Sequence, residues 1–494
     1  MELEKKYSCL TKNRLVINRS VNVDKNYQET LEAYLEDLHR VIRCECHSYV
    51  TSCDIVDSTA VVEGKSEICL TYTNADGELL YTEFIEDFTE KTALDSLSEF
   101  AFVVGDISDK YTNFRVINQR RIDIHTSFCL NLRVYDKVSC PCVNECDGSR
   151  LNSYSVKEQN VQNYILRKLE IDEEFSIPDN SNGIKRVFCY DINPCVTDSK
   201  AIKDKIFIKV KVDTKVLYTD NDNKTCCAKY TFDVSKICDI SGIDENSKCF
   251  IKINEGSLFV KAKSCADDTG GRIELYGDIY ACITVVNEID STIVTDGYIV
   301  GYQVENNYSS YLCSKKCDDL TVKKNERLTL KINSEIKSVL DLSLKINECV
   351  CKNKKIIIQI SFRLMYTNAE GKTEFFEEIK ELEHSIDNSD ILCAVAEIKS
   401  YDFNIVSDYS VDVNLNYEII SAMAVQEEIR VLSDILCDDN VVKAPALTLY
   451  FAKTGERLWD IAKSFSSDID LIKKENELTD DKLESNKIIV IPGL

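Results

Sequence analysis

Cysteines are the side chains in this chain best suited to binding a metal ion, and there are 23 of them. The densest run is CPCVNEC at 140–146, and CEC at 44–46 or Cys53 could supply a fourth thiolate. Structural zinc sites usually consist of two C-x₂₋₄-C pairs, and the C-x-C spacing fits them poorly. We interpret these cysteines as thiols that pack as small apolar residues. A structural zinc site is the alternative.

Oxygen ligands alternate in YTNADGE, where Asn74, Asp76 and Glu78 could bind calcium. An EF-hand loop has about twelve residues and lies between two helices, and no helical pattern flanks this stretch. Asp-Gly between two alternating runs is typical of a β-hairpin, because glycine readily adopts a positive φ. We interpret the stretch as a turn, with calcium binding as the alternative.

The residues that enzymes use most often are scattered here. The four histidines, His39, His47, His125 and His384, show neither an HExxH spacing nor a neighbouring nucleophile. Close pairs among the 84 acidic residues are expected by chance, and there is no Gly-rich phosphate loop. Catalysis requires a base, a nucleophile and an orienting group to converge. We therefore predict that the protein is not an enzyme and uses no cofactor.

The net charge of −24 disfavours binding to nucleic acid or to anionic lipid. No stretch approaches the roughly 20 apolar residues of a membrane helix. The first twenty residues contain no apolar run of the kind found in secretion signals, so we expect the protein to stay in the cytosol where it is made. The odd number of cysteines does not resemble a secreted disulfide framework.

The YTNADGE stretch is repeated along the chain as YTDNDNK and YTNAEGK. The tyrosines of the three copies, Tyr72, Tyr218 and Tyr366, are 146 and 148 residues apart. Alternating apolar runs enter and leave each copy, as in KIIIQISFRLMYT, and this period of two is typical of half-buried strands. The pattern predicts three tandem antiparallel β-sandwich-like domains.

We place the domain boundaries at residues 1–150, 151–320 and 321–440, followed by a different domain at 441–494. Helical patterns are visible in YQETLEAYLEDLHRVI (27–42) and QNVQNYILRKLEID (159–172), and we expect short helices there. The tail begins with an alternating strand and continues with two short helices, the second at about 468–475. The strand KIIVIP completes a β-α-α-β unit.

The tail resembles a LysM domain. The resemblance lies in the aromatic strand (Tyr450, Phe451), the Lys-Thr-Gly turn, the run LWDIAKSF and the Ile-Pro ending. It implies binding of N-acetylglucosamine-containing polymers by the loops after the first strand and after the second helix. Glu456-Arg457 replaces the usual Asp-Thr of the first loop, and Asn486 replaces a glycine. The candidate binding residues are Lys453, Thr454, Gly455, Glu456, Arg457, Leu458, Trp459 and Asn476.

Trp459 is the only tryptophan, and its spacing from Leu458 and Ala462 favours a place in the small core or at its rim. The alternative is an exposed ring that anchors a contact, as single tryptophans often do at interfaces. A semi-buried ring could serve both purposes.

The three repeated copies resemble the SPOCS domain family, through their RVI or RVF strand and the Y-T hairpin that follows it. Tandem SPOCS domains with one C-terminal LysM are the architecture of spore coat morphogenetic proteins of clostridia. This resemblance implies a scaffold in the mother-cell cytoplasm that recruits coat layers to the outer forespore membrane. It also implies that the LysM domain binds stage IV sporulation protein A, the coat basement ATPase.

Other coat proteins and the chain itself are further partners that the resemblance implies. The alternative is a cell-wall protein that binds peptidoglycan through LysM. The missing export signal and the Glu456-Arg457 pair argue against that alternative.

Overall fold

The computed structural model describes residues 4–95, 97–177, 183–264, 271–352, 354–386, 390–441 and 445–493. Antiparallel strands dominate these residues, and two short helices lie in the C-terminal tail. The predicted fold class, tandem β-sandwich-like domains followed by a β-α-α-β unit, is confirmed. Among the described residues, no helix is both long enough and apolar enough to span a membrane.

The same order of six strands occurs three times. The first unit contains β1 (Lys5–Thr30), β2 (Arg40–Val56), β3 (Thr59–Thr73), β4 (Leu79–Ala93), β5 (Phe102–Asn118) and β6 (Arg121–Cys146). The second contains β7 (Ser149–Ser176), β8 (Arg186–Ile202), β9 (Lys205–Thr219), β10 (Thr225–Asp239), β11 (Lys248–Ser264) and β12 (Gly271–Ile299). The third contains β14 (Leu320–Lys331), β15 (Ile336–Lys352), β16 (Lys355–Asn368), β17 (Thr373–Ser385), β18 (Asp390–Ser407) and β19 (Ser410–Val441).

Each unit is a sandwich of two three-stranded layers. The second, third and fourth strands form one layer, as in β2-β3-β4, and the first, sixth and fifth form the other, as in β1-β6-β5. One additional strand, β13 (Tyr302–Lys316), pairs with β19 and joins the second and third units into a seven-stranded sheet. On this pairing we propose that β13 belongs to the third unit.

The repeated YT stretch is the hairpin between the third and fourth strands of each unit. In the first copy the Asn74 Oδ1 accepts hydrogen bonds from the backbone N–H groups of Asp76 (3.1 Å) and Glu78 (2.9 Å). The side chain of Asp220 accepts the equivalent pair in the second copy. Gly77 has a φ of +79°, and Asn223 takes over this left-handed position with a φ of +61°. The interpretation as a turn is confirmed.

The predictions of short helices at 27–42 and 159–172 are both wrong. Residues 159–172 lie within β7, where all but Gln162 pair with β12, and Leu169 and Ile171 alternate into the core. Residues 27–30 complete β1, and the loop that follows closes one end of the sandwich with Leu31 and Leu38. Arg120 holds this loop by donating to the carbonyls of Leu31, Glu32 and Leu35. Pairing with a long neighbouring strand outweighs local helix propensity in 159–172 and in residues 27–30, and residues 31–39 form a loop.

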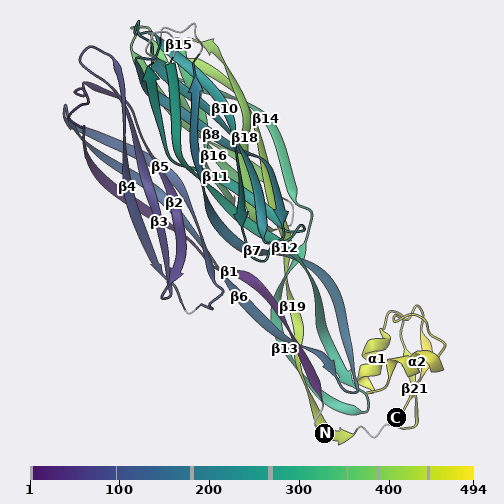
Figure 1. Ribbon diagram of the computed structural model, residues 1–494. Coiled ribbons are helices and arrows are strands. Elements are labelled where there is room, and N and C mark those ends of the chain that lie inside the picture. The colour runs from purple at the N-terminus through teal and green to yellow at the C-terminus, as the bar shows by residue number, and fades with distance from the viewer. Residues whose placement is uncertain are drawn as a thin grey trace.

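The three sandwiches lie side by side with their strands along the long axis of the molecule (Figure 1). The second strand of each unit carries a β-bulge, at Ile42, Phe188 and Leu340, between paired neighbours. All three bulge residues belong to one apolar cluster together with Leu217 and Met365. Because equivalent positions of all units meet there, the units surround a common axis with a shared interior.

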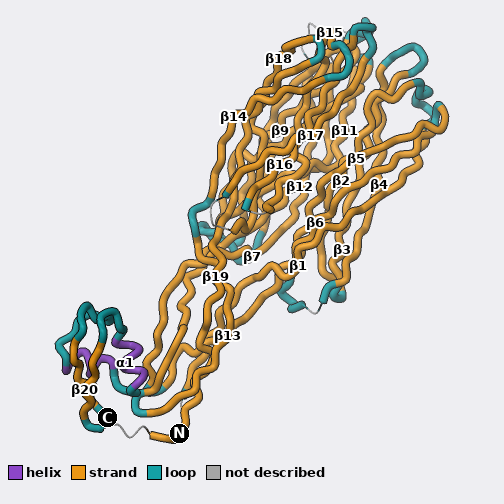
Figure 2. The backbone as a smooth tube through the Cα atoms, turned by 180° about the vertical axis from the view of Figure 1, so that it is seen from behind, coloured by secondary structure: helices purple, strands orange, loops and turns teal. Residues whose placement is uncertain are grey.

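Below the sandwiches, three strand pairs continue as a narrower bundle, which we call the stalk (Figure 2). The pairs are β1 with β6, β7 with β12, and β13 with β19, so each unit contributes one pair. Their inner faces pack together, and the core includes Leu10, Cys140, Ile293, Cys313 and Val431. Cys140 and Cys142 are therefore apolar core residues of the stalk. Cys140, Cys142 and Cys313 of this core are free thiols.

A layer of charged side chains is buried between the units, next to the shared apolar cluster. Glu45 contacts Arg43 and lies 3.4 Å from the Nε of Arg363 in the third unit. Lys345 of the third unit pairs with Glu255 of the second at 2.9 Å. Each of these ion pairs removes charge from water, so the units must dock in one register to keep the pairs intact.

Glu67 also lies in this layer, and its Oε1, like the Oε1 of Glu45, has no hydrogen-bond partner among the described atoms. Burial, followed by the charges of Glu83 and Glu255, raises the pKa of Glu67 to about 8. Its carboxyl is therefore protonated in the folded chain at neutral pH. Burial also lowers the pKa of the nearby His47 to about 4, so that imidazole is neutral.

Replacement of Phe188 by Ala tests the shared cluster. The ring is fully buried where the three units meet, so we expect the Phe188→Ala substitution to lower the free energy of unfolding by about 3–5 kcal/mol. Phe114→Ala is the matched control, because that ring is exposed on β5. Urea denaturation measures both variants. Equal, small losses would contradict a shared core.

Replacement of Glu67 by Gln tests the buried carboxyl. Above a pH of about 4.5 the carboxyl of Glu67 loses its proton in the unfolded chain but keeps it in the folded chain. The free energy of unfolding of the wild type therefore falls as the pH rises from about 4.5 towards 8. Glu67→Gln should remove this loss and stabilise the protein by about 1–3 kcal/mol at pH 7.5, with little effect at pH 4. Urea denaturation at both pH values measures the difference. A gain independent of pH would refute the assignment.

Candidate functional site

The C-terminal domain is built from β20 (Leu447–Ala452), α1 (Leu458–Ser464), α2 (Ile469–Glu475) and β21 (Lys487–Pro492). The two strands pair antiparallel from Leu447–Pro492 to Ala452–Lys487. Both helices pack on one face of this sheet, around a core of Ala452, Leu458, Ile461, Ala462, Ile472 and Ile489. The predicted β-α-α-β order is confirmed.

The loop after β20 contains the first group of candidate binding residues. Gly455 has a φ of +90°, and its N–H donates to the carbonyl of Leu483 at 2.8 Å. Both the N–H and the hydroxyl of Thr454 donate to the Oδ1 of Asn486, at 2.9 and 3.1 Å. Asn486, which stands in place of a glycine, thus ties the two loops at this end together. Lys453, Thr454, Gly455 and Arg457 are exposed.

Leu458 and Asn476 occupy structural positions. Leu458 is fully buried in the core of the domain. The Asn476 amide donates to the carbonyls of Ile472 (2.8 Å) and Val490 (2.6 Å), and its Oδ1 accepts from the N–H of Val490 at 2.6 Å. These three bonds join the end of α2 to β21, so Asn476 holds the domain together.

Trp459 faces the stalk instead of the solvent. Its ring packs edge-to-face on Tyr298 of β12 with 5.1 Å between centroids. Its indole N–H donates to the Oδ2 of Asp296 at 3.1 Å. Lys463, one turn further along α1, donates to both oxygens of Asp296 at 2.6 and 2.8 Å. Trp459 is therefore a residue at the rim of the core that also anchors a contact, and the contact is within the chain.

Asp296 is the central acceptor of this docking contact. Burial acts to raise the pKa of Asp296, but hydrogen bonds donated by Lys463, Trp459 and Tyr308 outweigh it and hold the pKa below its ordinary value. Arg150 adds a salt bridge to Asp468, the N-cap of α2, at 2.6 Å. No local pattern predicts this contact, because Asp296 and Trp459 lie 163 positions apart.

The outer face of the β20–β21 sheet, opposite the helices, is apolar and uncovered. Leu447, Leu449, Phe451 and Ile488 are 57, 66, 62 and 59% exposed. Phe451 pairs directly with Ile488, and Leu449 with Val490, so the side chains form one continuous patch. We call this patch the outer face. The period of two in LTLYF is the signal for this patch, because alternate residues of a strand share one face.

The other candidate ligands do not converge. Cys44 and Cys46 lie on β2 in the first sandwich, whereas the 140–146 cysteines lie on the β6 strand of the stalk. Among the residues that the structure describes, no three His, Cys, Asp or Glu side chains are grouped closely enough to hold a metal ion.

Comparison with protein families yields two matches. The SPOCS domain of SipL matches residues 183–262, and the LysM domain matches residues 450–492. The chain thus combines a SipL-type SPOCS domain with a C-terminal LysM domain, as expected of a SipL-like, spore coat-associated protein with a binding module. Both are non-catalytic binding domains. No curated protein and no solved structure matches the chain.

Asp296→Asn tests the docking of the LysM domain on the stalk. The neutral amide loses the ion pair with Lys463, so we expect Trp459 to become more exposed. Its fluorescence should shift to the red and be quenched more strongly by acrylamide. All of the tryptophan fluorescence comes from Trp459, because the chain has only one tryptophan.

Asp290→Asn, an exposed acid on the same strand, is the matched control and should leave the fluorescence unchanged. In the wild type, docking lowers the pKa of Asp296. The charge of Asp296 therefore stabilises the docked arrangement fully above about pH 4, and this stabilisation is lost as the pH falls further. Wild-type quenching that rises already between pH 8 and 5 would contradict this assignment.

Proposed function

We propose that the chain is a non-enzymatic scaffold of spore coat assembly. Its LysM domain would bind stage IV sporulation protein A, the coat basement ATPase, and thereby tether coat layers to the forespore surface from the mother-cell cytoplasm. The combination of SPOCS and LysM domains supports a role in the coat. Both are non-catalytic binding domains, which supports a scaffold over an enzyme.

The exposed outer face is the observation that supports a protein partner most directly. Four large apolar side chains on this two-stranded sheet are more than half exposed. Contiguous apolar patches of this kind usually mark interaction sites. Lys453 and Lys487 flank the Phe451–Ile488 end, so the patch has the apolar centre and polar rim of a protein interface.

The stalk contact fixes how this face is presented. The helices of the LysM domain are turned towards β12 and β13, and Gly301 N–H donates to the carbonyl of Ser466 at 2.8 Å. The outer face lies on the other side of the sheet from these helices. The scaffold would therefore hold the basement protein at the stalk end and the sandwiches away from it (Figure 1).

The far ends of the sandwiches would contact other coat proteins or a second copy of the chain. β5 exposes Tyr111, Phe114 and Val116, and the equivalent strand of the third unit, β18, exposes Phe403, Ile405 and Val406. Several weak contacts on one chain raise the overall affinity through effective concentration. A scaffold therefore needs no single tight site in this region.

A pull-down with the full-length chain tests the proposal. Purified stage IV sporulation protein A and insoluble peptidoglycan are offered separately. We expect retention on the basement protein, and Leu449→Glu or Ile488→Glu should weaken it at least tenfold, because a charge then lies in the buried centre of the contact. Both residues are exposed, so the fold should be unaffected.

Two control variants distinguish binding by the outer face from binding by other surfaces of the chain. Ile237→Glu changes an equally exposed residue on β10 of the second sandwich and should bind like the wild type. Arg457→Ala changes the loop that the family resemblance assigns to glycan. The proposal would be overturned if the wild type is retained on peptidoglycan, loses this retention with Arg457→Ala, and does not capture the basement protein. This result would establish the cell-wall alternative.

A further inference from the structure

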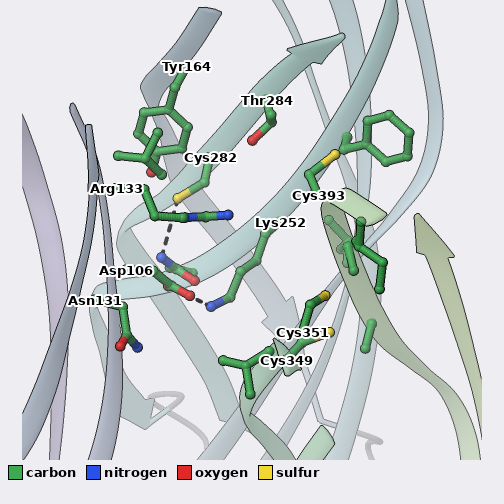
Figure 3. Close-up of a pocket in the computed structure, with 18 of the residues that line it drawn as sticks. Asp106, Asn131, Arg133, Tyr164, Lys252, Cys282, Thr284, Cys349, Cys351 and Cys393 are labelled. Carbon is green, nitrogen blue, oxygen red and sulfur yellow. Dashed lines mark hydrogen bonds and ion pairs between the residues drawn. The ribbon is translucent and has the colours of Figure 1, made fainter. Parts of the chain in front are cut away.

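A cavity of about 540 Å³ lies between the three units, below the buried charged layer. Strands of every unit line it: β5 and β6 of the first, β11 and β12 of the second, and β15 and β18 of the third. Figure 3 shows Arg133 and Lys252 on one side, with Cys349, Cys351 and Cys393 across from them. Its volume is in the range of small-ligand sites.

The charge of this lining is opposite to that of the whole chain. The sequence has 84 acidic and 60 basic residues, but the lining has four acids and eight Lys or Arg side chains. Each of the four acids pairs with one of the eight cations. The pairs are Lys252–Asp106, Lys345–Glu255, Lys211–Asp213 and Lys399–Glu397.

Four cations are left over: Lys12, Arg14, Arg133 and Lys352. None of them forms an ion pair with a carboxylate that the structure describes. Lys12 is buried, and its ammonium donates only to neutral oxygens, the Leu312 carbonyl and the Ser314 hydroxyl. Arg14 and Lys352 are exposed, so they lie where the cavity reaches the surface.

The thiols in the lining do not cancel this positive charge. Burial raises the pKa of Cys195, that of Cys282 and Cys351 to about 11, and that of Cys349 and Cys393 to about 12, so all five thiols are neutral at physiological pH. Two other carboxylates lie close by. Glu348 accepts from Ser108 and Asn131, and Glu158 accepts from Tyr311 and Ser314, and neither lines the cavity.

We propose that this cavity binds a small multivalent anion that carries carboxylate or phosphate groups. The planar guanidinium of Arg133 can bond two oxygens of such a group at once, and Lys12, Arg14 and Lys352 supply further charge. Thr284 adds a neutral donor, and Tyr135 and Phe250 provide an apolar wall. Because all three units line the cavity, the anion would also hold the units together.

Isothermal titration calorimetry of the full chain at low ionic strength tests this site, with citrate and inorganic pyrophosphate as separate probes for the two chemical groups. We expect at least one probe to bind and to raise the thermal unfolding midpoint. Arg133→Gln should weaken binding by about tenfold or more, and Lys352→Gln should weaken it less, because Lys352 lies at the exposed rim.

Arg19→Gln is the matched control, because Arg19 is exposed on β1 and does not line the cavity. Circular dichroism shows whether Arg133→Gln is folded, and Lys352→Gln provides a second test if it is not. No binding of either anion by the wild type, or equal binding by Arg133→Gln, Lys352→Gln and Arg19→Gln, would overturn the proposal.

Discussion

The rest of the structure depends on the packing of one bulge residue from each unit in a common cluster. A β-bulge redirects a side chain out of its regular alternation, and here Ile42, Phe188 and Leu340 are all redirected to the same place. The outer faces of the three sandwiches cannot bury these residues. The units therefore dock around one axis, and their extended strands meet below the sandwiches to form the stalk, on which the LysM domain rests.

The shared interior is polar over much of its length, and this has a structural consequence. Apolar clusters alone would let the units slide past one another, whereas ion pairs such as Lys252–Asp106 and Lys215–Asp341 connect different units at defined positions. Misaligned units would leave these charges buried and unpaired, at a cost of several kcal/mol each. In one region between the units the charged side chains do not all find partners. A space remains unfilled there, and this space is the cavity.

The local structure of the chain could be predicted from its sequence far better than the packing of its units. The period of two in KIIIQISFRLMYT and the Asx side chain at each hairpin report on neighbouring residues, so the strands and turns were predicted correctly. The helices predicted at 27–42 and 159–172 are wrong because the strand partners of residues 27–30 and of most of 159–172 lie about a hundred positions away. Arg43 and Glu45 look like surface residues in the sequence and are buried only by the neighbouring units. In the LysM domain the loop residues were predicted as a group, but the contact of Trp459 with Asp296 and the outer face were missed.

The two ends of the molecule then serve different purposes in the proposed scaffold. The sandwiches use their inner surfaces for one another, and the LysM domain uses its helices for the stalk, which leaves the outer face free for a partner. Fluorescence microscopy of the tagged full-length chain in sporulating cells tests this most directly. We predict a ring around the forespore for the wild type and diffuse mother-cell fluorescence when Phe451, also on the outer face, is changed to Glu. A ring that persists in that variant would contradict the assignment of the outer face as the tether.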